Sequence, residues 1–297
     1  MSGRRSFLLL ANGWAGGSEP DQVAAAHAVL ARAGQVAVVA SDTPTDVDRA
    51  LEDLHGRTLV VAGGDGTLHL TAQRLDVAGV LGTTRVAVIP LGTGNDLARA
   101  LGIPLDAEEA AKVAVTGRPR RLDVLRDEQG SIVVNAVHVG VGAEAAHHAA
   151  ALKDELGTMA YRLGGLLAGV REPGWQLAVA LDGQPVTAGD QPVLMVGVAN
   201  GPTIGGGTPL CPPALPDDAL LDVVVVSATG PAARAAFAVA LLAGQHLDRD
   251  DVTHAQGHEV AVQGEPVRSS ADGEVSDALE RHSYRVDPAA WEVLVPR

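Results

Sequence analysis

Cysteine is almost absent from this sequence, since Cys211 is the single cysteine among 297 residues. One cysteine excludes an internal disulfide and is typical of a protein in a reducing compartment, where an inert loop thiol is the ordinary interpretation. Long apolar runs are missing too, because no stretch reaches the roughly 18 to 20 uninterrupted apolar residues that a spanning helix needs. Any membrane contact is therefore expected to be peripheral.

Basic charge is also scarce. The chain has 22 Lys and Arg against 36 Asp and Glu, which gives a net charge of −14. Nucleic acid is excluded as the main partner, because phosphate backbones are bound by clustered Lys and Arg, and strong electrostatic binding to anionic lipid is disfavoured. Aromatic residues make up only 2% of a chain that is 46% hydrophobic, so the core must be built from Ala, Val and Leu. The length allows two domains, each with its own core.

The N-terminal segment Gly3–Leu9 resembles a twin-arginine export signal, but its apolar run ends by Ala11. That run is shorter than the roughly 7 to 15 residues of a signal sequence's apolar region. We therefore interpret residues 7–11 as the first strand and expect a cytoplasmic protein, transiently at the inner face of the membrane.

The most informative segment is VVAGGDGTL, residues 60–68, which places an acidic side chain in a glycine turn between a strand and a helix. Gly63, Gly64 and Gly66 leave N–H groups able to face an anion, and a helix beginning near Thr67 directs its positive end there. Asp65 would repel phosphates unless it binds a cation or a nucleotide hydroxyl, which favours a nucleotide with Mg²⁺. Taken alone, the turn is equally compatible with a tight turn that binds nothing.

A second turn of this kind follows the apolar strand RVAVIP, residues 85–90. It reads LGTGND, residues 91–96, and leads into a helix that we expect to end at Leu101. Loops at the carboxyl ends of neighbouring parallel strands line one crevice. The two loops are therefore predicted to share one site.

The pair GGDGT and PLGTGND resembles the catalytic domain of the diacylglycerol kinase family of lipid kinases. Sphingosine kinases are relatives, and NAD kinases and 6-phosphofructokinases are more distant ones. Further segments resemble family motifs in the family's order, and together they span nearly the whole chain: Arg121–Val124, Val133–Glu144, Val198–Ala219 and Asp272-Gly273-Glu274.

The resemblance implies an ATP-dependent kinase that transfers the γ-phosphate to the hydroxyl of diacylglycerol or a related amphiphilic alcohol, using Mg²⁺. Glu274 would deprotonate the acceptor hydroxyl, and Asp65 would be the second catalytic residue. The metal would be organised by Asp218, Asp96 and Asp123. The residues expected to contact the nucleotide are Asn12, Gly63, Gly64, Asp65, Gly66, Thr67, Gly92, Thr93, Gly94 and Asn95.

Some segments depart from the family pattern. The usual Asn-Pro-x-Ser-Gly turn is Asn12–Gly16 here, without the proline and serine, and the usual Asp-Asp-Gly is Asp217-Asp218-Ala219. These changes keep open a second hypothesis, a non-catalytic nucleotide- or lipid-binding regulatory protein with the kinase fold. Retention of the acidic residues favours the kinase. NAD kinase is disfavoured because no asparagine precedes a glutamate. The acceptor lipid and the oligomeric state, a homodimer included, stay open.

Apolar periodicity predicts the architecture. Strands and helices alternate up to residue 122, which indicates an α/β nucleotide-binding domain with a parallel sheet, 1–122, to which residues 286–297 return. Strands dominate from 123 to 285, which indicates a mostly antiparallel, sandwich-like substrate and metal domain. Its expected strands are 122–126, 132–139, 176–181, 193–199, 220–226 and 259–262, and its expected helices are 152–170 and 231–247.

Two signals are set aside. Residues 140–145, GVGAEA, match a loose dinucleotide fingerprint but lack the βαβ unit that it requires. None of the ten histidines shows metal-ligand spacing with an acidic partner, which favours surface or core histidines.

Overall fold

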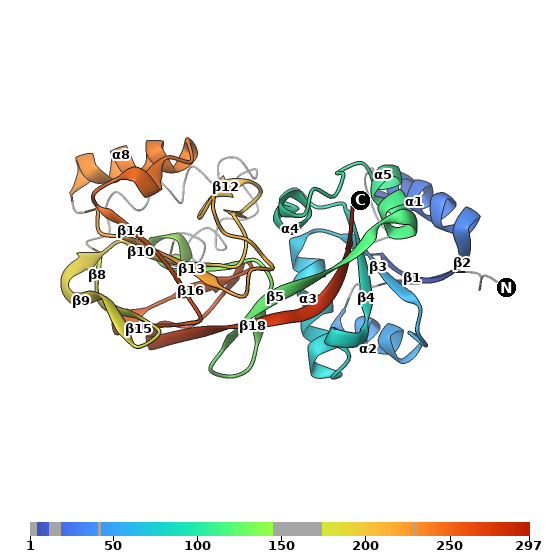
Figure 1. Cartoon of the computed structure of the whole chain (residues 1–297), viewed down its shortest axis with the longest axis horizontal. Helices are drawn as coiled ribbons and strands as arrows, with labels where there is room; N and C mark the ends of the chain where they lie inside the picture. Colours follow the sequence, from blue (N-terminus) through green and yellow to red (C-terminus); the bar gives the residue numbers. More distant parts are fainter. Residues whose placement is uncertain (1–4, 12–18, 41–42, 145–173, 229) are drawn as a thin grey trace. The chain divides into compact units, whose positions relative to one another are not determined.

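The computed structural model describes residues 5–11, 19–40, 43–144, 174–228 and 230–297 (Figure 1). The chain divides into two compact units, which are described separately. Unit 1 comprises Met1–Val124 and Pro288–Arg297, and unit 2 comprises Leu125–Asp287.

Unit 1 is built around a parallel sheet with the strand order β2-β1-β3-β4. The end of β18 joins the sheet beside β4, also in parallel, at Glu292 and Val293. Parallel strands are covered on both faces and therefore read as continuous apolar runs, as in β1, which is buried from Phe7 to Ala11. The strands are β1 (Arg5–Ala11), β2 (Gly34–Ala40), β3 (Thr58–Gly63), β4 (Arg85–Pro90) and β18 (Leu279–Val295).

Helices follow the strands of unit 1, and their ends match local sequence signals. Thr43 and Asp46 form a reciprocal capping box at the start of α2, with Pro44 in its first turn, and the Asp106 side chain caps α5. The helices are α1 (Glu19–Ala33), α2 (Pro44–Glu52), α3 (Asp65–Val77), α4 (Asp96–Ala100), α5 (Ala107–Thr116) and the 3₁₀ turn η1 (Leu81–Thr83). Among the described helices of the chain, none is long and apolar enough to cross a membrane.

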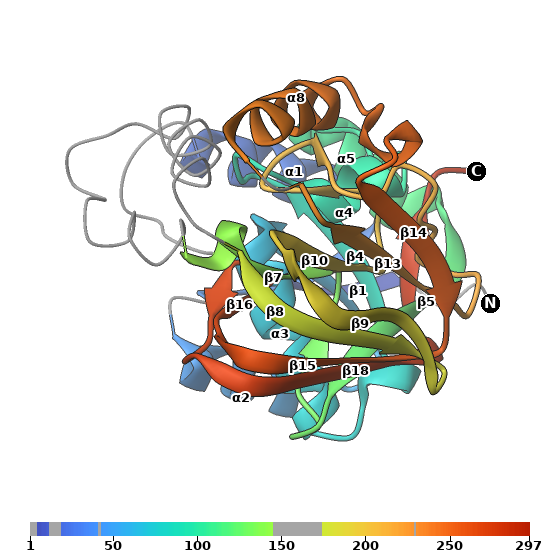
Figure 2. The same ribbon diagram turned by 90° about the vertical axis from the view of Figure 1, so that its left-hand side faces the viewer.

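Unit 2 is a sandwich of antiparallel strands. One sheet has the order β14-β13-β10-β7-β16-β17, and the other contains β18, β15, β8 and β9, as Figure 2 shows. The strands are β5 (Arg118–Asp127, entering from unit 1), β6 (Ile132–Val133), β7 (Ala136–Gly140), β8 (Trp175–Leu181), β9 (Gln184–Val193), β10 (Met195–Ala199), β11 (Thr203–Ile204), β12 (Thr208–Pro209), β13 (Leu221–Val226), β14 (Val252–Gly257), β15 (Glu259–Val267), β16 (Ser269–Ala271), β17 (Glu274–Val275) and the first part of β18.

The two faces of β13 contribute to different apolar clusters. Leu221, Val223 and Val225 pack between the sheets, whereas Val224 and Val226 face a second cluster that includes Phe237 and Leu241 of helix α8 (Pro231–Leu242). This alternation follows from the period of two along a strand. The predicted fold class, a parallel-sheet α/β domain followed by an antiparallel β domain, is confirmed.

Several predicted elements differ in extent. The expected strand 132–139 is divided into β6 and β7, and β9 was not expected because it contains Pro185 and Pro192. Both prolines are tolerated because β9 lies at an edge of its sheet. Helix α8 ends at Leu242 rather than 247, followed by Gly244 at φ 69° and the turn η2 (His246–Asp248). The predicted helix 152–170 lies outside the described residues.

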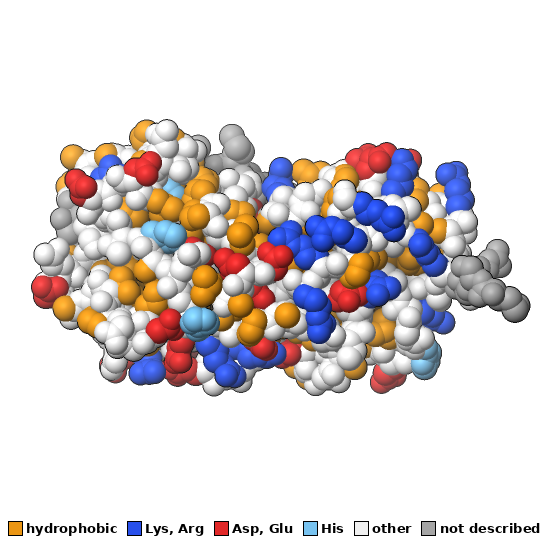
Figure 3. Space-filling model, viewed as in Figure 1, with side chains coloured by type: hydrophobic (Ala, Val, Ile, Leu, Met, Phe, Trp, Pro, Cys, Tyr) orange, Lys and Arg blue, Asp and Glu red, His pale blue; other side chains and the backbone are white. Residues whose placement is uncertain are grey.

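Charge is unevenly distributed over the surface. In the view of Figure 3, Lys and Arg side chains gather over unit 1. Strand β5 contributes Arg118, Arg120 and Arg121 in close succession, and Arg121 donates to the carbonyl of Gly82 at 2.8 Å. The net negative charge of the sequence is therefore not spread evenly over the surface of this unit.

Candidate active site

The two glycine loops leave the same edge of the parallel sheet in unit 1. Strands β3 and β4 are neighbours, and Gly63 at the end of β3 lies opposite Pro90 at the end of β4. The N–H of Leu91 donates to the carbonyl of Gly63 at 3.0 Å, which ties the starts of the loops together. The predicted convergence of the two loops is what parallel pairing produces.

The loops touch through two glycines that lack room for side chains. A Cβ on Gly92 would lie 2.4 Å from the Cα of Gly64, and a Cβ on Gly64 would lie 3.0 Å from the Cα of Gly92. Gly63 is also restricted, because its Cβ would lie 2.6 Å from the Thr67 hydroxyl. Glycine at these positions permits close backbone approach, which is a steric requirement of the loop pair itself.

Asp65 connects the two loops by a hydrogen bond. Its Oδ1 accepts the backbone N–H of Asp96 at 2.8 Å, and Asp96 is the first residue of α4. This N–H would otherwise be one of the unpaired donors of a helix start. Asp65 was expected to contact the nucleotide or its metal, and that role stays a prediction; in the structure one of its carboxylate oxygens also holds the second loop. Asp96 itself is buried.

Asn95 closes the second loop from within. Its backbone has a φ of 55°, its Oδ1 accepts the N–H of Gly92 at 3.0 Å, and its Nδ2 donates to the carbonyl of Gly92 at 2.6 Å. The side chain of Asn95 and the amide of Gly92 are therefore engaged inside the loop. Both residues were expected to contact the nucleotide. In this structure the amide of Gly92 is engaged within the loop, and the contact of Asn95 with the nucleotide stays a prediction.

The first turn of α3 presents backbone donors without a side-chain cap. The helix begins at Asp65, two residues earlier than expected, and its N-cap is Gly64, which has no side chain to accept a hydrogen bond. Gly66 is exposed, and a Cβ there would meet no atom within 4 Å. Thr67 is half-buried and contributes the hydroxyl beside Gly63. An uncapped helix start of this kind suits an anion.

Asp123 and Thr93 are two further predicted residues of unit 1. Asp123 is buried, and its Oδ1 accepts the N–H of Ala289 at 2.7 Å, which fixes the end of the chain beside β5. Thr93 is exposed in the second loop, beside Gly94. Asn12 lies outside the described residues.

Asp218 belongs to unit 2, in the segment that precedes β13. Its Oδ1 accepts the N–H of Leu220 at 3.1 Å across a tight turn. The residue between them, Ala219, has a φ of 63° and stands where the sequence resemblance implies glycine. The turn therefore positions a carboxylate at the cost of a left-handed alanine.

Glu274 follows a two-residue hairpin turn between β16 and β17. Asp272 and Gly273 have φ values of 47° and 96°, the combination that a type I′ turn requires, and Glu274 is exposed just after it. Asp272 was named from the sequence only as part of a family motif, with no role of its own, and its carboxylate accepts three backbone N–H groups at 2.7 to 3.1 Å. These donors are Val134, Asn135 and Ala136, so Asp272 anchors the hairpin to the β6–β7 connection.

Comparisons with known families agree with this division of the chain. Residues 6–126 match the diacylglycerol kinase catalytic domain, and residues 135–295 match the YegS C-terminal NAD kinase beta sandwich-like domain. A crystal structure of a diacylglycerol kinase from Bacillus anthracis str. Sterne superimposes with a TM-score of 0.76 over 98% of this chain and 97% of that one, at 21% identity. The fold is thus that of a two-domain kinase of the diacylglycerol kinase type.

Curated relatives extend the match to sequence. A protein of Pseudomonas aeruginosa strain PAO1 named "Probable lipid kinase YegS-like" is 37% identical over 224 residues, which cover 74% of this chain and 71% of that protein. A protein of the same name from Pseudomonas savastanoi pv. phaseolicola is 33% identical over 272 residues, covering 86% and 81%. The chain belongs to the YegS-like lipid kinases, a family of phosphotransferases.

Proposed function

We propose that this lipid kinase uses ATP and Mg²⁺ to phosphorylate the hydroxyl of diacylglycerol or a related amphiphilic alcohol. Membership of the family supports a lipid kinase, and the nucleotide, the metal and the acceptor are our proposal. Our proposal includes peripheral contact with a membrane from the cytoplasmic side, because the proposed acceptor is a lipid.

The observation that carries the nucleotide assignment is Gly66. Glycine in a helix costs roughly 0.5 to 1 kcal/mol relative to alanine, and nothing within 4 Å of a Cβ at this position requires it. A glycine without an internal reason, on an uncapped helix start, favours close approach by a ligand. We propose that the N–H groups of Gly66 and Thr67 bind ATP phosphates, with Thr93 and Gly94 contributing from the second loop.

The acidic residues divide between charge neutralisation and proton transfer. Carboxylate oxygens suit Mg²⁺, and Asp218 offers a carboxylate already fixed by the Leu220 N–H, with Asp96 and Asp123 proposed to support the water shell. Bound Mg²⁺ neutralises charge on the transferring phosphate. Glu274 is proposed to accept the proton of the acceptor hydroxyl, because it is exposed and held beside the anchored Asp272. Positioning and charge account for most of the rate in such transfers.

Replacing Gly66 by alanine tests the phosphate assignment. Gly66→Ala should raise the free energy of unfolding by about 0.5 to 1 kcal/mol, because alanine favours the helix, while the KM for ATP rises through the added methyl group. Urea unfolding and ATP titration would be measured on the same preparation. A more stable enzyme with an unchanged KM for ATP would remove Gly66 from the nucleotide site.

Paired substitutions separate the base from the metal. Glu274→Gln keeps the side-chain length but removes the basic oxygen, so kcat should fall by roughly 10² to 10⁴ with ATP affinity retained. Asp218→Asn should lose activity that is partly restored by raised Mg²⁺. Equal rescue of both variants by Mg²⁺, or weakened ATP binding in the Glu274 variant, would mean that Glu274 does not act as the base.

A non-catalytic binding protein with the kinase fold is the competing function, motivated by the altered 12–16 turn and by Ala219. ATP consumption with and without dispersed diacylglycerol separates the two. Acceptor-dependent ADP formation that disappears in Glu274→Gln supports the kinase. Nucleotide binding without turnover on any lipid alcohol supports the binding protein.

A further inference from the structure

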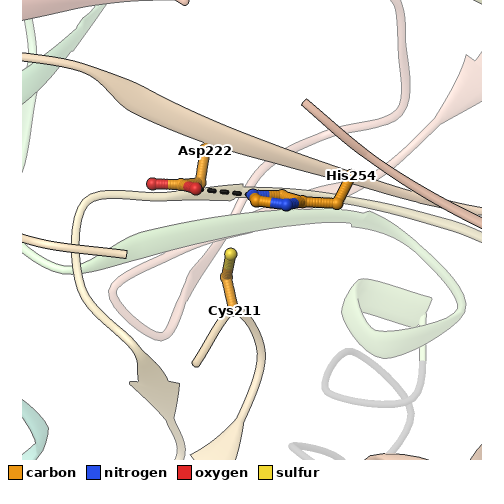
Figure 4. A group of neighbouring side chains, drawn as sticks. All are labelled: Cys211, Asp222 and His254. Carbon is orange, nitrogen blue, oxygen red and sulfur yellow. Dashed lines mark hydrogen bonds and ion pairs between the residues drawn. The ribbon is translucent and has the colours of Figure 1, made fainter. Parts of the chain in front are cut away.

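A buried cluster of three metal-ligand side chains lies in unit 2, apart from every residue assigned above. Cys211, Asp222 and His254 each place one ligand atom within 4.8 Å of the others (Figure 4). Among the described residues this is the one group of at least three Cys, His or acidic side chains with such geometry. Its members are far apart in sequence, which is why no spacing motif marks them.

Strand pairing brings two of the residues together. Asp222 on β13 lies opposite Gln256, and His254 on β14 lies opposite Val224, so Asp222 and His254 are diagonal neighbours on one face. Cys211 reaches the same face from the loop after β12. Its N–H donates to the carbonyl of Pro202 at 3.1 Å, and its carbonyl accepts the N–H of Ala214 at 2.9 Å. The three side chains therefore stand on fixed backbone.

The charge of Asp222 is incompletely compensated. This side chain is 1% exposed, and its Oδ1 contacts Nε2 of His254 at 2.6 Å. Its Oδ2 is buried and accepts no hydrogen bond of good geometry from the residues that the structure describes, and the Cys211 thiol is the further group that interacts with this carboxylate. A buried carboxylate oxygen without a partner is costly, because the lost hydration is not replaced. A cation at this position would supply the missing partner.

The third ligand is enclosed by the protein. Cys211 is fully buried within the apolar cluster beneath α8. The side chains of Asp222 and His254 are the polar groups beside its sulfur in this cluster of three. Cysteine binds a metal as the thiolate, so binding of an ion would release the thiol proton.

We propose that Cys211, Asp222 and His254 bind a divalent transition-metal ion of the zinc class. A set of one sulfur, one imidazole nitrogen and one carboxylate oxygen is typical of zinc, whereas Mg²⁺ takes oxygen ligands. The site is therefore distinct from the proposed Mg²⁺ position at Asp218. Three protein ligands leave a fourth position of the tetrahedron for water.

The ion would anchor the segment 211–222, which contains Asp218 of the proposed Mg²⁺ site. Residues 211 and 222 bracket Asp218 and Ala219, so a metal that joins Cys211 to Asp222 closes this segment into a short loop anchored on β13 and β14. An ion that binds the folded chain and not the unfolded chain stabilises the folded state by mass action. Zinc is thus expected to stabilise unit 2 without taking part in phosphoryl transfer.

Co²⁺ is a suitable probe, because a cobalt–thiolate bond produces a charge-transfer absorption and Cys211 is the single thiol of the chain. The full-length protein, stripped with a chelator, should develop this band at one equivalent of Co²⁺ and lose it on addition of Zn²⁺. Even outer-shell partners of metal ligands are worth about 10- to 100-fold in affinity, so Asp222→Asn and His254→Gln should each raise the Kd by at least about tenfold. His258→Gln, at an exposed histidine of the same unit, is the matched control.

Zn²⁺ should also raise the melting temperature of the wild type but not that of Cys211→Ser. Absence of the thiolate band in the wild type at excess Co²⁺ would overturn the proposal. An unchanged Kd in both the Asp222 and His254 variants would overturn it as well. Should Asp222→Asn fail to fold, His254→Gln decides, because the His254 side chain is 26% exposed and tolerates replacement more readily.

Discussion

Ala219 adopts a backbone conformation that alanine rarely occupies. Its φ of 63° lies in the left-handed region, which costs an L-residue with a Cβ roughly 1 to 2 kcal/mol. The strain sits beside Asp218, whose carboxylate is held by the N–H of Leu220 across this very residue. The position thus keeps the geometry of a glycine turn although the glycine itself is missing.

Replacing Ala219 by glycine should relieve this strain. Because glycine enters the left-handed region freely but has a more flexible unfolded chain, the net gain in the free energy of unfolding should be about 0.5 to 1 kcal/mol. Ala243→Gly provides the control. Ala243 has a φ of −84°, so this substitution should lower the free energy of unfolding by about as much as Ala219→Gly raises it. Urea denaturation of both variants would decide. A loss of stability in both would mean that Ala219 is not strained.

At the scale of elements, the β3–α3 and β4–α4 connections behave as one structural piece. The Gly64–Gly92 contact, the Asp65–Asp96 hydrogen bond and the internal closure by Asn95 act on the same pair of loops. Any side chain that separates the glycines also displaces the acceptor of the Asp96 N–H. Rigid loops of this kind hold their hydrogen-bond donors in place before a ligand arrives, so binding does not have to order the loops.

Gly92→Ala is expected to damage function more than folding. The new methyl group would meet the Cα of Gly64, and overpacking of this sort costs typically 1 to 3 kcal/mol. A displacement near 1 Å in a positioning element can cost about 10²-fold in rate, so kcat/KM for ATP should fall by roughly that factor. Gly82→Ala, whose Cβ would come no closer than 3.3 Å to the Ala290 carbonyl, should leave kcat/KM nearly unchanged. Similar losses in both variants would contradict the argument.

The sequence predicted these elements where the signal is local. Apolar runs followed by glycine turns indicated the strands β3 and β4 and the helices after them, because short apolar runs bounded by glycine are typical of buried parallel strands. It could not reveal that Asp65 holds an N–H 31 residues away, or that Asp272 anchors donors about 137 residues earlier. Those contacts depend on the packed chain. The roles of Asp218 and Glu274 stay predictions.

At the scale of the whole molecule, unit 2 contains several histidines that folding keeps neutral. Burial lowers the pKa of His138 to about 4, and burial is also the main cause that lowers the pKa of His246 and His282. The unfolded chain takes up these protons near pH 6.5, whereas the folded chain resists them. Folding stability from these groups is therefore fully present above pH 6.5 and is lost as the pH falls below it, for His138 down to about pH 4.

Acid titration of stability should show this loss. At about 1.4 kcal/mol per pKa unit, His138 alone accounts for up to about 3 kcal/mol of this loss by pH 4. Urea midpoints would be measured between pH 7.5 and 4 in wild type and in His138→Leu. The variant should show a flatter profile. Identical profiles would mean that His138 takes up its proton equally in both states.

The contact between Gly64 and Gly92 has a consequence for how this gene can change. Each glycine is required because the backbone of the other loop is so near. Substitutions at the two positions act on one contact, so their effects are expected to be non-additive. The two codons, 28 positions apart in the chain, are thereby linked by epistasis.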